Sequence, residues 1–261
     1  MSKISVSPLY EGTFSVGLDK KFIRIEKDDP PKKGSLKLSI NPFLIQEDNR
    51  NILFDVGLGE FGEDTSTQTI IDNLETKGVA DYEVTDIFAS HLHYDHLGGL
   101  AGQQSGYWEL TFPDANLWVS KNEWDKLTEE VHQHDEDKKD FFHFIEARAN
   151  LKFLDDEDQP LPNVRVKKIG GHTEFSLALF YENQQNKYVM AGDVVGTRGE
   201  INRNFAAKYD YDPKQSMAVR EELKKLAFES GYIFMAYHET HHPLFKLTGF
   251  DENKGYTIKN I

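Results

Sequence analysis

The stretch "SHLHYDHLGG", residues 90–99, places three histidines and an aspartate within six positions. Side chains alternate along an extended chain, so His91 and His93 point to the same side and can reach one metal ion. Asp95 and His96 come where "HLGGL" could begin a helix, which turns their side chains toward a neighbouring position. Two metal ions a few ångströms apart would need this division of ligands. The stretch therefore predicts a metal site rather than a histidine-rich loop.

Three further ligand-type side chains follow apolar strands later in the chain. His172 lies in "IGGHTEFSL" after the strand that ends at Ile169, Asp193 follows an apolar run and a glycine in "YVMAGDVV", and His238 ends "YIFMAY". Sites on a rigid scaffold usually lie where strands meet loops. Each signal is weak alone, because an aspartate after a glycine is more often a turn residue. Their joint occurrence favours additional metal ligands.

Short apolar and β-branched runs predict strands that are interleaved with helices. The expected strands are 36–45, 51–56, 84–90, 117–120, 164–169, 176–181, 187–192 and a last one at 232–237. This order predicts an α/β fold with two packed sheets and helices outside, because each helix has one apolar stripe to bury. The pattern also leaves a three-layer doubly wound sheet open.

Capping signals predict where three helices begin and end. One runs from Gln68 to Lys77 and stops at Gly78, a second follows the capping box of Ser120 and Glu123, and a third runs from Asp212–Pro213 to Gly231. Two charge-rich runs are expected to be a solvated helix face (132–140) and an exposed loop (154–160). His132, His134 and His143 have no neighbouring ligand spacing and carry little weight as ligands.

Composition limits the class of protein. The chain of 261 residues is expected to form one domain, 1–261, and its net charge of −14 disfavours nucleic acid as a partner. It has no cysteine, so any metal must be held by nitrogen and oxygen. No signal peptide or 18-residue apolar run is found, so we expect a cytoplasmic protein without a membrane partner. A homodimer is left open.

These motifs together resemble the metallo-β-lactamase-fold hydrolase superfamily over most of the chain. "NILFDVGLG" resembles the family's Asp-x-Gly turn and "TDIFASHLHYDHLGGL" its HxHxDH motif. "LWVSKNEWD", "GGHTEFSLALFY", "KYVMAGDVV" and the histidine after "YIFMAY" follow in the family's order. The resemblance implies a four-layer αββα sandwich and points most closely to the lactonase and organophosphate-hydrolase branch.

The resemblance also implies a role for each ligand. His91, His93 and His172 would bind the first metal; Asp95, His96 and His238 the second, with Asp193 bridging. His238 is preferred over His241 and His242 because it adjoins the apolar strand. Asp55 resembles the family's aspartate that orients the site; a turn residue capping Gly57 is an equal alternative.

The expected reaction is hydrolysis of a small ester or lactone by a hydroxide that bridges two divalent ions, zinc first, with manganese, iron or cobalt as alternatives. Asp95 would act as the catalytic proton shuttle. Alternatives are a phosphoester, thioester (glyoxalase II-like) or nucleic-acid hydrolase on the same site, and a non-catalytic metal-binding sensor. Phe205, Tyr209 and Tyr211 are candidates for contacting a small-molecule substrate, although core packing or plain exposure is the more ordinary reading of each.

Overall fold

The computed structural model describes residues 4–47 and 49–261. The chain divides into two compact units, Met1–Phe153 and Leu154–Ile261. Each unit contains a large sheet and helices, so the predicted α/β class is confirmed. That residues 1–261 make a single domain stays a prediction.

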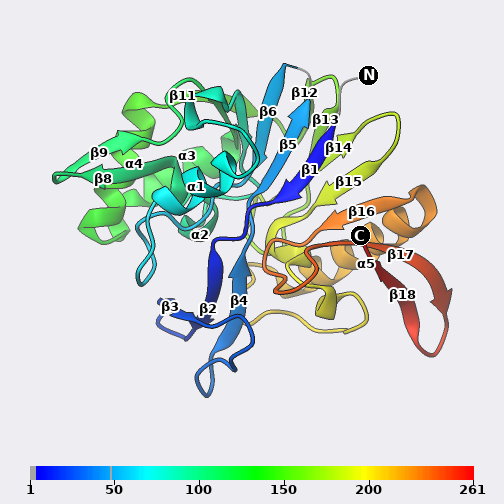
Figure 1. Ribbon diagram of the computed structural model, residues 1–261. Coiled ribbons are helices and arrows are strands. Elements are labelled where there is room, and N and C mark those ends of the chain that lie inside the picture. The colour runs from blue at the N-terminus through cyan, green and yellow to red at the C-terminus, as the bar shows by residue number, and fades with distance from the viewer. Residues whose placement is uncertain (1–3, 48) are drawn as a thin grey trace. The chain divides into compact units, whose positions relative to one another are not determined.

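The first unit is built on a six-stranded sheet with the order β1-β5-β6-β7-β10-β11. Figure 1 shows β1, β5 and β6 of this sheet side by side. Its strands are β1 (Ser5–Pro8), β5 (Phe43–Glu47), β6 (Arg50–Phe54), β7 (Asp86–Phe88), β10 (Asn116–Ser120) and β11 (Asn150–Leu154). Strands β6, β7 and β10 run parallel to one another. Their carboxyl ends therefore lie at one edge of the sheet.

Helices cover one face of this sheet. They are α1 (Gln68–Glu75), α2 (Tyr94–Leu97), α3 (Lys121–Glu130) and α4 (Glu136–Arg148), with 3₁₀ turns η1 (Asp81–Glu83), η2 (Gly98–Leu100) and η3 (Val131–Gln133). Ile70 of α1, Trp124 of α3 and Phe141 of α4 share a core with Leu53 and Ile87 of the sheet. Each helix buries one stripe, as its amphipathic sequence requires.

Two smaller sheets complete the first unit. A three-stranded sheet has the order β3-β2-β4, and a hairpin pairs β8 with β9. Their strands are β2 (Gly12–Val16), β3 (Phe22–Ile25), β4 (Leu36–Ile40), β8 (Ala101–Gln104) and β9 (Tyr107–Leu110). The hairpin lies beside α4 (Figure 1).

The second unit is built on a seven-stranded sheet in sequential order from β12 to β18. Its elements are β12 (Glu157–Leu161), β13 (Val164–Lys168), β14 (Leu177–Glu182), β15 (Lys187–Met190), η4 (Gly192–Val195), η5 (Arg198–Glu200), α5 (Pro213–Ser230), β16 (Tyr232–Met235), β17 (Leu244–Asp251) and β18 (Gly255–Asn260). Helix α5 packs on β16 and β17 (Figure 1). Leu223 and Ala227 of the helix share a core with Phe234 and Phe245 of the sheet.

Strand direction decides where the loops of the second unit emerge. Strand β14 is antiparallel to both β13 and β15, and β15 is parallel to β16. Strands β13, β15 and β16 therefore run the same way and end at the same edge of the sheet. The segments that follow these three strands carry His172, Asp193 and His238.

Helix boundaries agree with the capping signals. The Ser120 side chain accepts a hydrogen bond from the Glu123 backbone nitrogen, and Asp212 accepts from two backbone nitrogens of α5. Helix α5 ends at Gly231, which is left-handed. Helix α1 ends earlier than predicted, at Glu75 rather than Lys77, with Thr76 as its C-cap in place of Gly78.

Three sequence predictions, two of strands and one of a loop, are wrong in detail. The expected strand 36–45 is two strands in different sheets, because Pro42 has no N–H to continue a ladder. The run 154–160, expected as a loop, contains most of β12, whose backbone pairs with β13 while its charged side chains lie at a sheet edge. The strand near 232–237 is not the last, since β17 and β18 follow it.

Across residues 4–47 and 49–261, no helix has the length and apolar character to cross a membrane.

Candidate metal centre

The first group of candidate ligands emerges from adjacent parallel strands of the first unit. Asp55 directly follows β6, and the segment from Ser90 to His96 follows β7. The His93 backbone is extended and is the N-cap of α2, so Asp95 and His96 turn into the first helical residues. The chain geometry predicted from "HLHYDH" is therefore present.

Asp55 is the hydrogen-bonding centre of this group. Its carboxylate accepts from the Ser90 backbone nitrogen at 2.7 Å, from Ser90 Oγ at 2.7 Å and from His96 Nδ1 at 2.6 Å. The side chains of Asp55 and His96 are fully buried. Asp55 also lies at a turn with a positive φ of 55°. Asp55 therefore lies at the turn after β6 with its carboxylate in contact with His96.

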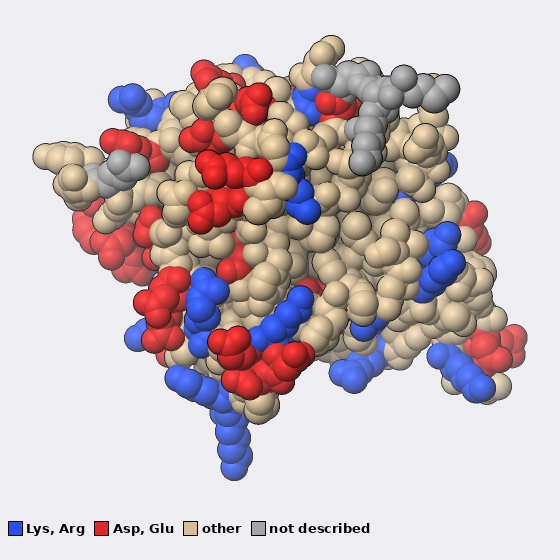
Figure 2. All heavy atoms as spheres, in the orientation of Figure 1, with Lys and Arg blue, Asp and Glu red and all other residues tan. Residues whose placement is uncertain are grey.

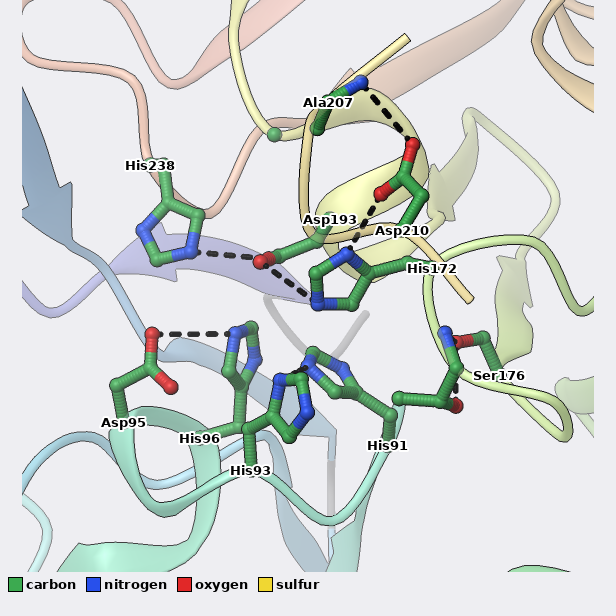
Figure 3. A network of polar contacts seen from close by, with 12 residues as sticks. His91, His93, Asp95, His96, His172, Ser176, Asp193, Ala207, Asp210 and His238 are labelled. Atoms are coloured by element: carbon green, nitrogen blue, oxygen red, sulfur yellow. Dashed lines mark hydrogen bonds and ion pairs between the residues drawn. The ribbon is translucent and has the colours of Figure 1, made fainter. Parts of the chain in front are cut away.

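The four candidate ligands of this unit lie close together. His91 Nε2 is 3.0 Å from His93 Nδ1, and His96 Nε2 is 3.7 Å from Asp95 Oδ2 (Figure 3). The rings of His91 and His96 have centroids 4.0 Å apart. His91 and His96 are buried, whereas His93 is exposed and Asp95 is half-buried. We call His91, His93, Asp95 and His96 the first cluster.

Backbone packing holds the first cluster against the turn after β6. The Val56 backbone nitrogen donates to the His96 carbonyl at 2.8 Å, and the Gly99 nitrogen donates to the Gly57 carbonyl at 3.2 Å. A Cβ on Gly99 would collide with the Val56 carbonyl oxygen. The Gly-Gly pair of "HLGGL" is therefore needed for this close approach.

The second group of candidate ligands lies at the shared edge of β13, β15 and β16. His172 Nε2 is 3.3 Å from Asp193 Oδ2, and His238 Nε2 is 2.9 Å from Asp193 Oδ1 (Figure 3). Each carboxylate oxygen of Asp193 thus faces a different histidine. The structure brings these three predicted residues together, and we call them the second cluster. His241 and His242, the alternatives to His238, are exposed.

A carboxylate that we did not predict orients His172. Asp210 Oδ1 is 2.9 Å from His172 Nδ1, and Asp210 Oδ2 accepts from the Ala207 backbone nitrogen at 3.2 Å (Figure 3). Asp210 is buried. It lies in "KYDYDP", a loop we singled out for its aromatic residues, and an isolated aspartate in such a loop gives no ligand spacing. Ser90 Oγ lies 3.1 Å from His91 Nδ1, and Ser90 was also not predicted, because serine is not one of the ligand types in the motif.

The donor atoms of each cluster suit a divalent metal ion. Metal-bound histidines usually donate a hydrogen bond from their other ring nitrogen to a carboxylate or carbonyl. His96 has such a contact with Asp55, and His172 with Asp210. With metal–ligand bonds of about 2.0–2.2 Å, two donors on one ion lie about 2.9–3.4 Å apart. The separations of 3.0 Å in the first cluster and of 2.9 and 3.3 Å in the second lie in this range, and the 3.7 Å between His96 Nε2 and Asp95 Oδ2 lies just outside it.

The predicted substrate contacts are exposed on one loop of the second unit. Phe205, Tyr209 and Tyr211 have exposed fractions of 38%, 45% and 60%. The pKa of the Tyr209 phenol is raised by partial burial and by the negative charges of Asp210 and Asp193. Tyr209 therefore lies in the field of the second cluster.

The histidines that carried little weight as ligands lie on or beside the helices of the first unit. His132 and His143 are exposed. His134 Nδ1 is 3.4 Å from the Tyr94 hydroxyl, and the pKa of His134 is lowered, chiefly by burial. Burial also raises the pKa of Tyr94. We treat this pair as a structural contact.

A known protein family matches most of the chain. The model of the family described as "Metallo-beta-lactamase superfamily" matches residues 37–237. A search of curated proteins gave no match.

Solved structures with the same fold cover nearly the whole chain. A probable metal-dependent hydrolase from Staphylococcus aureus is 20% identical with a TM-score of 0.77, covering 99% of this chain and 97% of that one. AidC, described as a dizinc quorum-quenching lactonase in complex with a product, is 20% identical with a TM-score of 0.78, covering 100% and 95%. AbOPH, a hydrolase in the beta lactamase superfamily, is 21% identical with a TM-score of 0.77, covering 99% and 94%.

Proposed function

The chain belongs to the metallo-beta-lactamase superfamily, and from that premise we propose that it is a dinuclear metal-dependent hydrolase of a small ester or lactone. The observation that carries the proposal is the Asp193 carboxylate, whose two oxygens face two different histidines at 3.3 and 2.9 Å. A carboxylate placed in this way suits a bridge between two ions. The dizinc lactonase among the structures of like fold supports the choice of zinc and of a lactone.

The proposed site uses both clusters. His91 and His93 with His172 would hold one ion, and Asp95 and His96 with His238 the other. When bound, the ions would supply Lewis acidity and lower the pKa of a water molecule toward about 7. Manganese, iron or cobalt would fit the same nitrogen and oxygen donors.

The chain's own residues would orient the reaction. Asp55 and Asp210 hold His96 and His172 by their Nδ1 atoms, so Nε2 is the ring nitrogen directed at the ligand position. Asp95 is half-buried, with Oδ2 3.7 Å from His96 Nε2, and would accept a proton and return it to the leaving group. The exposed aromatic residues of the 202–213 loop would contact the apolar part of the substrate.

Charge supports a small substrate over nucleic acid. The net charge is −14, and on the face shown in Figure 2 basic side chains are interspersed with groups of acidic ones. Phosphate backbones are usually met by clustered Lys and Arg. A cytoplasmic location, the absence of a membrane partner and a homodimer stay predictions.

A substrate panel with matched histidine variants tests the proposal. We expect the zinc-loaded protein to hydrolyse lactones or aryl esters faster than thioesters, phosphotriesters or phosphodiesters, and a chelator to abolish the activity. His93→Ala should lower kcat/KM by at least about a hundredfold, as loss of a ligand in a metal site does. His143→Ala, at an exposed histidine of α4, is the control and should match the wild type.

Two results would overturn this assignment. Turnover that survives both chelation and His93→Ala would remove metals from the mechanism. Stoichiometric metal without turnover of any substrate class would leave the non-catalytic metal-binding sensor.

A further inference from the structure

Helix α5 carries a row of polar residues on its buried face. Ser216, Arg220 and Lys224 are four residues apart and are 0%, 3% and 5% exposed. Residues four apart share one face of a helix, and this face also carries the buried Leu223 and Ala227. A cation is expensive to bury unless its hydrogen bonds are met. The row therefore requires an explanation beyond core packing.

Each member of the row contacts a backbone segment near the second cluster. Ser216 packs against Gly171, next to His172, where a Cβ would lie 2.6 Å from Ser216 Oγ. Lys224 Nζ donates to the Ile201 carbonyl at 2.9 Å and pairs with Glu221. The helix thus holds the loops that follow β13 and β15.

Arg220 is the member that joins two of these segments. Its Nε donates to the Val194 carbonyl at 2.8 Å, one residue after Asp193. Its Nη1 donates to the Phe205 carbonyl at 2.8 Å, and its guanidinium lies 4.9 Å from the Phe205 ring centroid. Phe205 begins the stretch that leads to Asp210. One planar guanidinium therefore connects the Asp193 turn with the loop that orients His172.

Glu200 lies beside the turn that carries Asp193. The half-buried Glu200 accepts a hydrogen bond from the Gly196 backbone nitrogen at 2.9 Å. Desolvation by burial raises the pKa of Glu200 to about 7, while the charge of Arg220 lowers it. The Gly196 carbonyl in turn accepts from the His238 backbone nitrogen at 2.9 Å. The Glu200–Gly196 contact thus connects the turn that carries Asp193 with His238.

We propose that Arg220 is a positioning residue of the second cluster, which sets the place of Asp193 and of the Phe205–Asp210 loop through its two carbonyl contacts. The inference rests on the proposed function. A lysine cannot replace Arg220, because an ammonium on a flexible stem lacks the rigid fork that reaches both carbonyls. Lys224, on the same face but bound to the more distant Ile201, does not take this role.

Zinc binding to the full-length protein tests the inference without using activity. Zinc affinity is measured by competition with a chromogenic chelator for the wild type, Arg220→Lys, Arg220→Met and the control Lys224→Met, with folding checked by circular dichroism. We expect both Arg220 variants to lose at least about tenfold in affinity, the scale of losses at groups that orient ligands. The zinc affinity of Lys224→Met should stay within about twofold of that of the wild type, even if its Tm falls as far as that of the Arg220 variants.

Cobalt supplies a second readout. The visible spectrum of the Co²⁺-loaded protein should change in Arg220→Lys and stay unchanged in Lys224→Met, because only Arg220 holds the Asp193 turn. KM for the best substrate should rise in Arg220→Lys, since the Phe205–Asp210 loop is released. If Arg220→Met does not fold, Arg220→Lys, which retains the charge and most of the volume, decides the question.

The outcomes separate the two proposals. Arg220→Lys with wild-type zinc affinity and an unchanged cobalt spectrum overturns the positioning role and leaves the proposed function standing. Equal losses in Arg220→Lys and Lys224→Met would show general destabilisation and also overturn it. A wild-type protein that retains no zinc or cobalt overturns the proposed function, and the positioning role with it.

Discussion

In each unit, a buried carboxylate accepts a hydrogen bond from Nδ1 of a candidate ligand histidine. Asp55 does so for His96 at 2.6 Å and Asp210 for His172 at 2.9 Å. Such contacts fix the tautomer and the orientation of a ligand ring and raise its basicity. At the scale of single residues, we therefore expect these two aspartates to affect metal affinity through the histidines that they orient.

Replacement of Asp55 by asparagine tests this role. We predict that Asp55→Asn weakens zinc affinity about 10- to 100-fold, because an amide cannot hold His96 as a carboxylate does. The matched control is Asp86→Asn, in the same sheet at the amino end of β7, where Asp86 accepts from Trp118 Nε1 at 2.9 Å and Asn116 Nδ2 at 3.1 Å. Chelator competition should show wild-type affinity in the control; equal affinities in both variants would remove Asp55 from the site.

Glu11 gives a prediction about pH and stability. It is buried against the Gly57–Leu58 turn, and its Oε2 accepts from the Leu58 backbone nitrogen at 3.0 Å. Burial raises the pKa of Glu11 from 4.5 to about 8. The folded state therefore keeps a proton that the unfolded state releases above its lower pKa.

The sign of the effect follows from this difference in pKa. Between about pH 4.5 and 8 the folded chain binds more protons at Glu11, so the free energy of unfolding falls as pH rises. Glu11 lowers the free energy of unfolding by about 1.4 kcal/mol per pH unit in this range, and the full loss of stability is present above pH 8. We predict that Glu11→Gln flattens this part of the profile and is more stable than the wild type at pH 8.5. Denaturant titrations at several pH values measure it; parallel profiles would contradict the prediction.

Helix α5 is the element on which the second cluster depends most. Its N-cap, Asp212, accepts from the Lys214 and Gln215 backbone nitrogens, and its own nitrogen donates to the Gly171 carbonyl at 2.8 Å. Gln215 Nε2 donates to the Ile169 carbonyl at 3.0 Å. The first turn of α5 is thus joined to the segment that carries His172.

A pair of N-cap variants tests this dependence. Asp212→Ala and Asp135→Ala each remove an aspartate cap, of α5 and α4 respectively, and each should cost about 1 kcal/mol. Only Asp212→Ala should also lower zinc affinity, because only its helix holds the His172 segment. Thermal unfolding and chelator competition measure the two effects. Equal zinc affinities at equal loss of stability would show that the first turn of α5 does not control the cluster.

Sequence reasoning worked best where one local rule decided the outcome. The caps at Ser120 and Asp212 were readable because a cap needs only a few neighbouring residues. The polar row on α5 was not, because Arg220 and Lys224 look like ordinary surface cations until the carbonyls they meet are known. Asp210 was missed for the same reason, since its partner His172 is 38 residues away in the chain.

At the scale of the whole molecule, each unit carries one cluster at the carboxyl ends of parallel strands. Asp55 and His91 follow β6 and β7 in the first unit, and Asp193 and His238 follow β15 and β16 in the second. The motif order along the chain predicted this fold, and the family model and the structures of like fold confirm it. Substrate class could not be predicted, because it depends on the loop that carries Phe205, Tyr209 and Tyr211, where ordinary side chains serve many chemistries.

Anomalous diffraction at the zinc edge, from crystals of the zinc-loaded protein, tests the central claim most directly. We predict two peaks per chain, both within bonding distance of Asp193, with His91, His93 and His172 around one and Asp95, His96 and His238 around the other. A single peak, no peak, or peaks bound by residues of one cluster alone would contradict the two-metal site.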